Sequence, residues 1–159
     1  MTPLSVKEAR IRLGEDMAER IENGEGALYE GAGDILLSLK AEGHTLIFLS
    51  NCRFHYMERH KRVFGLERFF DFFYCCEAFG FIPKYEIFRR IAPEHRAPFI
   101  VVGDRFHDIE TSVQNGLPSI GCGYGYGSPG ELDKADIIVN SVSGIPGAVH
   151  NILSRKEPK

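Results

Sequence analysis

The chain has 159 residues, of which 43% are hydrophobic and 26% are charged. This length fits one domain with a sizeable core, and the composition is that of an ordinary globular protein. Nineteen Lys and Arg residues against 22 Asp and Glu residues give a net charge of -3, which offers no electrostatic reason to expect a nucleic acid or an acidic membrane as partner.

Cysteines and apolar runs indicate the compartment. Cys52, Cys75, Cys76 and Cys122 form no Cys-x-x-Cys pair and are few for a disulfide scaffold. Apolar runs such as residues 45–49 are too short to cross a bilayer, and acidic residues stand where a signal peptide would be apolar. We therefore expect a soluble, cytoplasmic protein.

The first predicted elements are helices. Apolar side chains at helical spacing predict one amphipathic helix in the first 25 residues, ending near Asn23-Gly24. A second helix is expected to start at Asp34 as its N-cap and to run to Gly43, the usual kind of C-terminal stop.

From residue 45 onward, apolar runs alternate with helical patterns. Strands are predicted at 45–50, 72–75, 98–102, 118–122 and 137–139, and helices at 56–63, 85–91, 109–114, near Glu131 and at 146–153. Continuous apolar strands separated by helices favour a mostly parallel sheet covered on both faces. Right-handed crossovers make this a doubly wound, Rossmann-like α/β fold.

Polar residues gather at three positions that border the predicted strands. Ser50-Asn51-Cys52 follows the first strand, Pro83-Lys84 precedes the helix at 85–91, and a loop from Gly103 to Asp108 follows the strand at 98–102. Because ligands of doubly wound folds bind outside the carboxyl ends of the strands, these residues carry the most weight.

Their side chains suit phosphate and magnesium. Asp104 and Asp108 are four residues apart, and Mg²⁺ is usually held by one or two carboxylates together with waters and phosphate oxygens. Ser50 offers a hydroxyl donor and Lys84 a fixed positive charge. Singly, each has a structural explanation: an Asp caps the following helix, Ser50 ends a strand, and Lys84 is a solvated surface lysine. The combination favours a functional site.

In this order, the motifs resemble those of the haloacid dehalogenase superfamily, especially its phosphoglycolate phosphatase-like branch, over about residues 28–149. Family members carry a strand-ending Ser/Thr-Asn, a phosphate-holding lysine, and Gly-Asp-x-x-x-Asp followed by Ile-Glu. The stretch from Gly123 to Asp136 is also similar to the family's C-terminal pattern. The resemblance implies a Mg²⁺-dependent phosphate-monoester hydrolase acting on a small phosphorylated molecule.

The resemblance also implies roles for single residues. Ser50, Asn51 and Lys84 would contact the substrate, with Ser50 hydrogen-bonded to the transferring phosphoryl group and Lys84 neutralising it. Asp104 would bind Mg²⁺, with Asp108 in support. Lys84 departs from the family's spacing, since Phe88 follows it by four residues where many relatives have six, so a shorter loop must lead to Lys84.

The family's nucleophile is missing. Its chemistry begins with Asp-x-Asp-x-Thr after an N-terminal strand, where the first Asp attacks phosphorus and the second protonates the leaving group. The seven Asp residues of this chain stand at 16, 34, 71, 104, 108, 133 and 136, and no two are separated by a single residue. We therefore expect the chain alone to be inactive or nearly so.

The missing strand defines the expected organisation. Residues 1–27 would be a helical remnant of the family's cap, residues 28–154 the core domain without its N-terminal strand, and residues 155–159 a polar tail. In the family that strand lies between the strands ending at Ser50 and Gly103, so its loss would leave two ladders of unpaired backbone groups.

Three explanations are open. The chain is a truncated piece of an active phosphatase; or the two flanking strands pair directly, giving a non-catalytic binding or dimerising module; or another chain, in a homodimer or a different partner, donates a strand.

Other patterns receive weaker interpretations. Gly125–Gly130 fits Gly-x-Gly-x-x-Gly, but it stands late in the chain and lacks the acidic strand end of a dinucleotide site. Cys75 and Cys76, adjacent on a strand, would point to opposite faces and share no metal ion. The aromatic run 69–74 is expected to be core packing rather than a partner-binding patch. His107, inside the acidic loop, is a candidate substrate contact.

Overall fold

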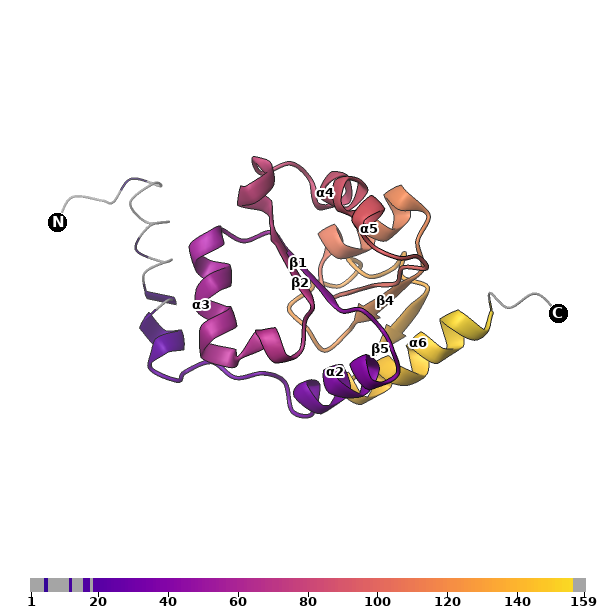
Figure 1. Ribbon diagram of the computed structural model, residues 1–159, viewed down its shortest axis with the longest axis horizontal. Coiled ribbons are helices and arrows are strands. Elements are labelled where there is room, and N and C mark those ends of the chain that lie inside the picture. Colours follow the sequence, from indigo (N-terminus) through magenta and orange to yellow (C-terminus); the bar gives the residue numbers. More distant parts are fainter. Residues whose placement is uncertain (1–4, 6–11, 13–15, 18, 156–159) are drawn as a thin grey trace.

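The computed structural model describes residues 5, 12, 16–17 and 19–155. Five short parallel strands alternate with helices through this part of the chain, as Figure 1 shows. The strands are β1 (Ile47–Ser50), β2 (Phe72–Cys75), β3 (Val101–Gly103), β4 (Ser119–Cys122) and β5 (Ile137–Val139). The labelled α-helices are α2 (Ala32–Ala41), α3 (Phe54–Phe64), α4 (Lys84–Ile91), α5 (Phe106–Asn115) and α6 (Ile145–Ser154). Four 3-10 turns lie between them at Leu66–Arg68, Cys76–Phe79, Ala92–Glu94 and Val142–Gly144.

The strands form two parallel sheets rather than one. β1 pairs with β2, with Ile47 opposite Phe72. The order of the other sheet is β3-β4-β5, with Val101 opposite Ser119. Among the described residues β1 and β3 do not pair with each other, so the alternative in which these flanking strands close the gap directly is contradicted. The predicted parallel, doubly wound α/β architecture is confirmed, with a break in its middle.

Helices cover both sides of the strands and hold the two sheets together. In Figure 1, α4 and α5 lie side by side along one side of the strands, whereas α2 and α6 lie along the opposite side. The Arg89 side chain of α4 donates to the Gln114 carbonyl (2.8 Å) and to the Asn115 side chain (2.9 Å) of α5. Because α4 follows β2 and α5 follows β3, this contact bridges the two halves.

Each half has its own apolar core. The larger core surrounds Ile120 of β4, which is fully buried, and includes Leu39 of α2 and Ile152 of α6. The smaller core centres on Ile87 of α4, also fully buried, with Leu49 of β1 packed against it. Helix packing therefore stabilises both halves separately.

Several predicted elements coincide with the observed ones. The strands at 72–75 and 137–139 have the predicted bounds, and the other elements from β1 to α6 lie where the alternation places them. Strand β3 begins at Val101, three residues later than predicted, and the Ala97–Pro98 bond that precedes it is cis. No helix forms near Glu131, where the chain follows a series of turns.

The start of the second helix differs from its prediction. The N-cap is Gly31, in a left-handed conformation (φ 74°), and Asp34 lies inside the first turn without a side-chain capping bond. An acidic residue there still interacts favourably with the helix dipole, which explains the misassignment. The predicted C-terminal stop is confirmed, since Gly43 adopts φ 91° directly after the C-cap.

The N-terminal helix is described only in part. It includes residues 16–17 and 19–22 and ends at the turn at Asn23-Gly24, as predicted. Glu22 accepts hydrogen bonds from Arg59 (3.0 Å) and Arg62 (2.7 Å) of α3, which lies beside it in Figure 1. Most of the start of this segment, and residues 156–159 of the expected polar tail, lie outside the described residues.

The aromatic run is only partly core. Phe69 is buried, and Phe70 packs edge-on against Phe48 of β1, with ring centroids 5.5 Å apart. Phe72, however, is 42% exposed and contacts the His95 ring.

No helix among the described residues has the length and apolarity that crossing a membrane requires.

Candidate active site

A cleft of about 360 Å³ lies between β1 and β3 and reaches the carboxyl ends of both strands. Its walls include the whole of both strands and apolar side chains of α4. Four of the predicted site residues line it: Ser50, Lys84, Asp104 and Asp108. Asn51, the fifth, follows β1 at the bend but is not part of the lining. Folding therefore brings together residues that are up to 58 positions apart, from Ser50 to Asp108.

Lys84 is the first residue of α4, and its ammonium group points at the first turn of α5, the helix that follows β3. Its Nζ donates to Asp108 Oδ1 at 2.6 Å, and the two side chains are only 12% and 14% exposed. The short approach that the sequence required is made by the 3-10 turn Cys76–Phe79 and two left-handed residues, Gly80 and Phe81. A largely buried, charge-assisted pair thus fixes the position of both groups.

Asp108 also stabilises the start of α5, the helix-capping role that is the structural alternative to a functional one. Its Oδ2 accepts a hydrogen bond from the Arg105 amide (3.1 Å) at the start of α5. A Cβ on Gly103 would collide with the Asp108 side chain, so glycine at this position leaves the space that Asp108 occupies. Both oxygens of this carboxylate are therefore engaged within the chain.

Asp104 is held by the loop after β4. Its Oδ2 accepts a hydrogen bond from the Tyr126 amide (2.7 Å). A Cβ on Gly125 would collide with the Asp104 side chain, and one on Gly127 would collide with the Asp104 carbonyl oxygen. These glycines thus permit close packing around a predicted site residue, which explains the Gly-x-Gly pattern without a dinucleotide.

Glu131 does not line the cleft but supports the loop after β3, a role that the sequence did not indicate. Its carboxylate accepts hydrogen bonds from Arg105 Nε (2.9 Å) and from the amides of Phe106 (2.8 Å) and Ser128 (3.1 Å). These bonds tie the loop after β3 to the glycine-rich loop. The Arg105 guanidinium, followed by the two amides, lowers the pKa of Glu131 to about 2. Its place in a predicted helix concealed this role.

The low pKa of Glu131 predicts a dependence of stability on pH. A carboxyl whose pKa falls on folding stabilises the native state above its unfolded pKa, near 4.5, and loses that contribution as the pH falls toward about 2. We expect Glu131→Gln to be less stable than the parent at pH 7, and the difference to shrink between pH 4.5 and 2. Urea unfolding of both proteins at pH 7, 4 and 3 measures it; a difference that stays constant with pH would contradict the ion-pair assignment.

The two carboxylates that line the cleft, Asp104 and Asp108, are the candidate ligands of a metal ion. Within the residues that the structure describes, no three His, Cys, Asp or Glu side chains are grouped so as to hold a metal ion. Asp104 has one oxygen bonded to an amide, whereas Asp108 is held by Lys84 and an amide. Since Mg²⁺ needs only one or two carboxylates beside waters and phosphate oxygens, Asp104 fits as a ligand and Asp108 fits as its support.

Cysteine and histidine do not extend the site. Burial raises the pKa of the Cys52 thiol above its usual range, which disfavours the nucleophilic thiolate. Cys76 donates a hydrogen bond to the Cys52 carbonyl at 3.2 Å, and all four cysteines are free thiols. His107 does not line the cleft; its side chain is 58% exposed and lies 3.8 Å from Glu110, so its suggested role as a substrate contact is not supported by position.

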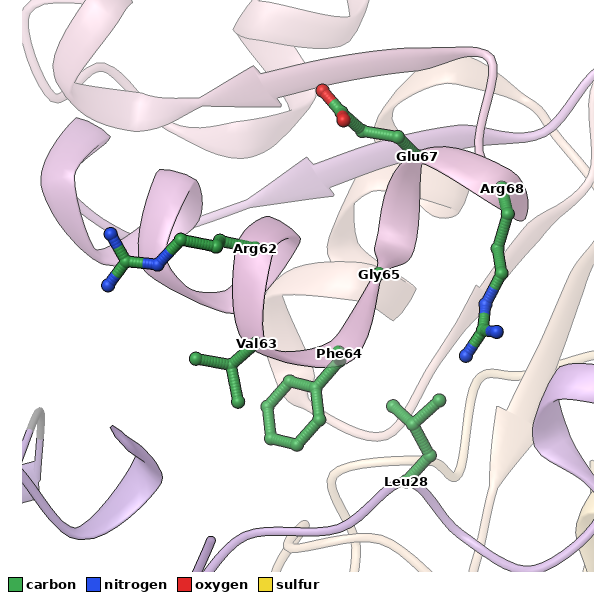
Figure 2. A pocket seen from close by; sticks show the side chains of 7 residues that line it. All are labelled: Leu28, Arg62, Val63, Phe64, Gly65, Glu67 and Arg68. Carbon is green, nitrogen blue, oxygen red and sulfur yellow. The ribbon is translucent and has the colours of Figure 1, made fainter. Parts of the chain in front are cut away.

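A second, open depression of about 650 Å³ lies at the C-terminal end of α3. Figure 2 shows Leu28, Val63 and Phe64 at its base, with the Arg62 and Arg68 side chains on either side. Both arginines are engaged, Arg62 with Glu22 and Arg68 over the Phe69 ring at 4.6 Å. The depression shares no lining residue with the cleft.

Comparisons with known proteins identify the family of this chain. The model of the haloacid dehalogenase-like hydrolase family matches residues 4–122. A 5'-nucleotidase from Pseudomonas aeruginosa is 32% identical over 115 residues, which are 68% of this chain and 51% of that protein. The chain thus spans about half the length of this curated relative.

Solved structures agree on the fold. A predicted phosphatase from Clostridium acetobutylicum is 29% identical, with a TM-score of 0.65 over 77% of this chain and 60% of that one. A predicted phosphoglycolate phosphatase from Haemophilus somnus has a TM-score of 0.75 over 93% of this chain and 69% of that one; at 21% identity this likeness concerns the fold alone. Because the family model matches most of the chain, over residues 4–122, this chain belongs to the haloacid dehalogenase-like hydrolases.

Proposed function

We propose that this chain forms the phosphoryl-binding part of a Mg²⁺-dependent phosphate-monoester hydrolase, and that alone it is inactive or nearly so. The observation that carries the proposal is the convergence of Ser50, Lys84 and Asp104 on one cleft at the strand ends. A hydroxyl, an ammonium and a carboxylate at the mouth of an α/β sheet suit a phosphate together with its cation.

The residues would divide the work by their chemistry. The Ser50 hydroxyl would donate to a phosphoryl oxygen, and Asn51 would contact the substrate at the rim. Lys84, already oriented by Asp108, would neutralise the negative charge of the phosphate. Asp104 would hold Mg²⁺ with the support of Asp108. Bound there, Mg²⁺ would stabilise the charge on the phosphoryl group during transfer.

The expected lack of turnover follows from the side chains that line the cleft. Among the described lining residues, the carboxylates are Asp104 and Asp108, and each accepts a backbone hydrogen bond within the chain. Cys52, the nearby thiol, has a raised pKa and is not activated. A phosphoryl transfer that proceeds through a covalent intermediate needs an activated nucleophile. The cleft would therefore bind the phosphate without attacking it.

We also propose the class of substrate and the compartment of the protein. The likeness to a 5'-nucleotidase favours a nucleoside 5'-monophosphate as the small phosphorylated ligand. A reducing, cytoplasmic compartment would suit the four free thiols.

Turnover of p-nitrophenyl phosphate in the presence of Mg²⁺ tests the proposal. We expect the purified chain to release no more nitrophenol than buffer alone, while inorganic phosphate with Mg²⁺ shifts the amide resonances of Ser50 and Lys84. Lys84→Ala should abolish these shifts, and Lys134→Ala, at an exposed lysine outside the cleft, should leave them unchanged.

Two outcomes would overturn it. Robust turnover that is lost in Asp104→Ala would refute the inactivity. Absence of any phosphate-induced shift near the cleft would refute the phosphoryl-binding role.

A further inference from the structure

Exposed aromatic side chains follow the carboxyl ends of four strands. They are Phe54 after β1, Phe81 after β2, Phe106 after β3 and Tyr126 after β4, and each is more than half exposed. The carboxyl ends of parallel strands are where ligands of such folds bind, and the cleft opens there between β1 and β3. Single exposed aromatic residues are common on surfaces, but a group of them around one opening marks a contact surface.

Tyr126 combines an exposed ring with a fixed backbone. At 84% it is the most exposed of the large hydrophobic side chains that the structure describes. Its amide nevertheless donates to Asp104 Oδ2 at 2.7 Å, and the amide of Gly125 donates to the Cys122 carbonyl at 3.1 Å. A Cβ on Gly125 or on Gly127 would collide with Asp104. The ring is thus carried by a backbone that is already ordered, which lowers the entropic cost of binding a ligand against it.

The Tyr126 side chain extends toward the loop that follows β1. Burial, followed by the nearby Cys52 thiol and the Tyr126 hydroxyl, raises the pKa of Tyr56 in the first turn of α3. Burial, followed by Tyr126 and Asp104, also raises the pKa of Tyr29. Charged groups shift a pKa in this way only from close by. Since β3 and the cleft lie between β4 and β1, the Tyr126 side chain lies across the mouth of the cleft.

This position decides what a ligand meets outside the phosphate site. With its phosphate between Ser50, Lys84 and Asp104, a phosphate monoester directs its organic group outward, past the residue whose amide bonds Asp104. A planar heteroaromatic group can lie on the Tyr126 ring in an offset stack, whereas an aliphatic group has no ring to stack. Stacking of a nucleobase on an aromatic side chain is favourable for every base, because each has a π-face.

We propose that Tyr126 is a specificity-determining residue of this site, and that its ring stacks on the planar heteroaromatic group of the phosphate monoester. The ring selects nucleoside 5'-monophosphates over aliphatic phosphate esters, without a strong preference among the bases. The inference rests on the proposed function, because the phosphate site positions the organic group beside the ring.

Binding of two phosphate monoesters to the purified chain provides the test. Adenosine 5'-monophosphate carries a heteroaromatic ring, and glycerol 3-phosphate carries the same phosphate on an aliphatic group. In isothermal titration calorimetry with Mg²⁺ we expect the nucleotide to bind roughly ten-fold or more tightly. The carbon-bound protons of its adenine ring should shift upfield on binding, which is the magnetic resonance signature of a stacked aromatic ring and requires no variant.

Three variants assign the preference to the ring. Tyr126→Ala keeps the backbone amide that bonds Asp104, so the nucleotide should lose roughly ten-fold or more in affinity while glycerol 3-phosphate binds as before. Tyr126→Phe keeps the ring and should retain the preference. The control is Phe72→Ala, because Phe72 is an exposed aromatic residue, at 42%, that begins β2 and does not line the cleft. It should leave both affinities unchanged.

Three results would overturn the proposal. The first is equal affinity of the parent chain for the two ligands without an upfield shift of the adenine protons, which is independent of how the variants fold. The second is a nucleotide preference that persists in Tyr126→Ala, which would assign it to another residue. The third is a parallel loss of both ligands in Tyr126→Ala, which would give residue 126 a role in the phosphate site alone.

Failure of the proposed function has a different signature. Inorganic phosphate would then cause no shift of the Ser50 and Lys84 amide resonances, and neither monoester would bind. If those shifts are present and the nucleotide preference is absent, the phosphate site stands and only the role of Tyr126 is refuted.

Discussion

Replacing Ile120 with alanine is expected to lower the free energy of unfolding by about 2–5 kcal/mol. Ile120 is fully buried at the centre of β4 and belongs to the larger core. Truncating a buried isoleucine loses its transfer free energy and leaves a cavity that close-packed neighbours fill only in part. Urea unfolding followed by circular dichroism gives the difference between the two proteins.

Ile138→Ala is the matched control. Ile138 has the same side chain and lies on the neighbouring strand β5, yet it is 49% exposed. Its truncation should cost no more than about 1 kcal/mol, as is usual for partly exposed positions. Equal losses at the two sites would mean that β4 does not form the centre of the core.

The position of this core was readable from the sequence because its signal is local. The run at 137–139 is continuously apolar, and the run at 118–122 contains one polar side chain, that of Ser119; both are typical of strands covered on both faces. Ile120 and Val139 are buried accordingly. The prediction of a helix near Glu131 was wrong for the converse reason. A short stretch with charged residues has helical propensity, but here Glu131 bonds Arg105 and the stretch is part of the glycine-rich loop.

The break between the sheets was only half predictable. The sequence contains no Asp-x-Asp pair, and for this reason we expected a gap in the middle of the sheet, where the family has the strand that carries this motif. Whether β1 and β3 would then pair with each other depends on how far apart α4 and α5 hold them. That distance follows from side-chain packing between helices, which no local pattern encodes.

The candidate site shows the same division. Residue types at strand ends identified Ser50, Lys84 and Asp104, which the fold brings to one cleft. The support around them was not visible, because the contact between Asp104 and the Gly125–Gly127 loop joins residues about twenty positions apart, and no charge on the loop indicates its partner. Spacing of glycines after a strand is the one signal that could have suggested it.

The Lys84–Asp108 pair is the second position where a large effect is expected. Asp108→Ala should lower the free energy of unfolding by about 2–3 kcal/mol, somewhat less than the loss for a fully buried pair, because both side chains keep slight exposure. The substitution removes the carboxylate that accepts from Lys84 and from the Arg105 amide, and it leaves a largely buried ammonium without its partner.

A double-mutant cycle separates the pair from the capping bond. Lys84→Met keeps most of the side-chain volume and removes the charge, so it should cost about 1–2 kcal/mol through the unpaired carboxylate. With Lys84 already replaced, Asp108→Ala loses only the bond to Arg105, and its additional cost should fall to about 1 kcal/mol. The resulting coupling of about 1–2 kcal/mol measures the ion pair itself.

Glu67→Ala supplies the exposed comparison. Glu67 lies 3.2 Å from Lys61, but its side chain is 73% exposed, so its removal should change stability by less than about 1 kcal/mol. If the free-energy losses of the Lys84 and Asp108 substitutions added up within about 0.5 kcal/mol, the Lys84–Asp108 pair would be no stronger than the exposed Lys61–Glu67 pair. Lys84 would then not be held by Asp108 in solution. A bound phosphate would itself have to orient the Lys84 side chain, which in the structure Asp108 already orients.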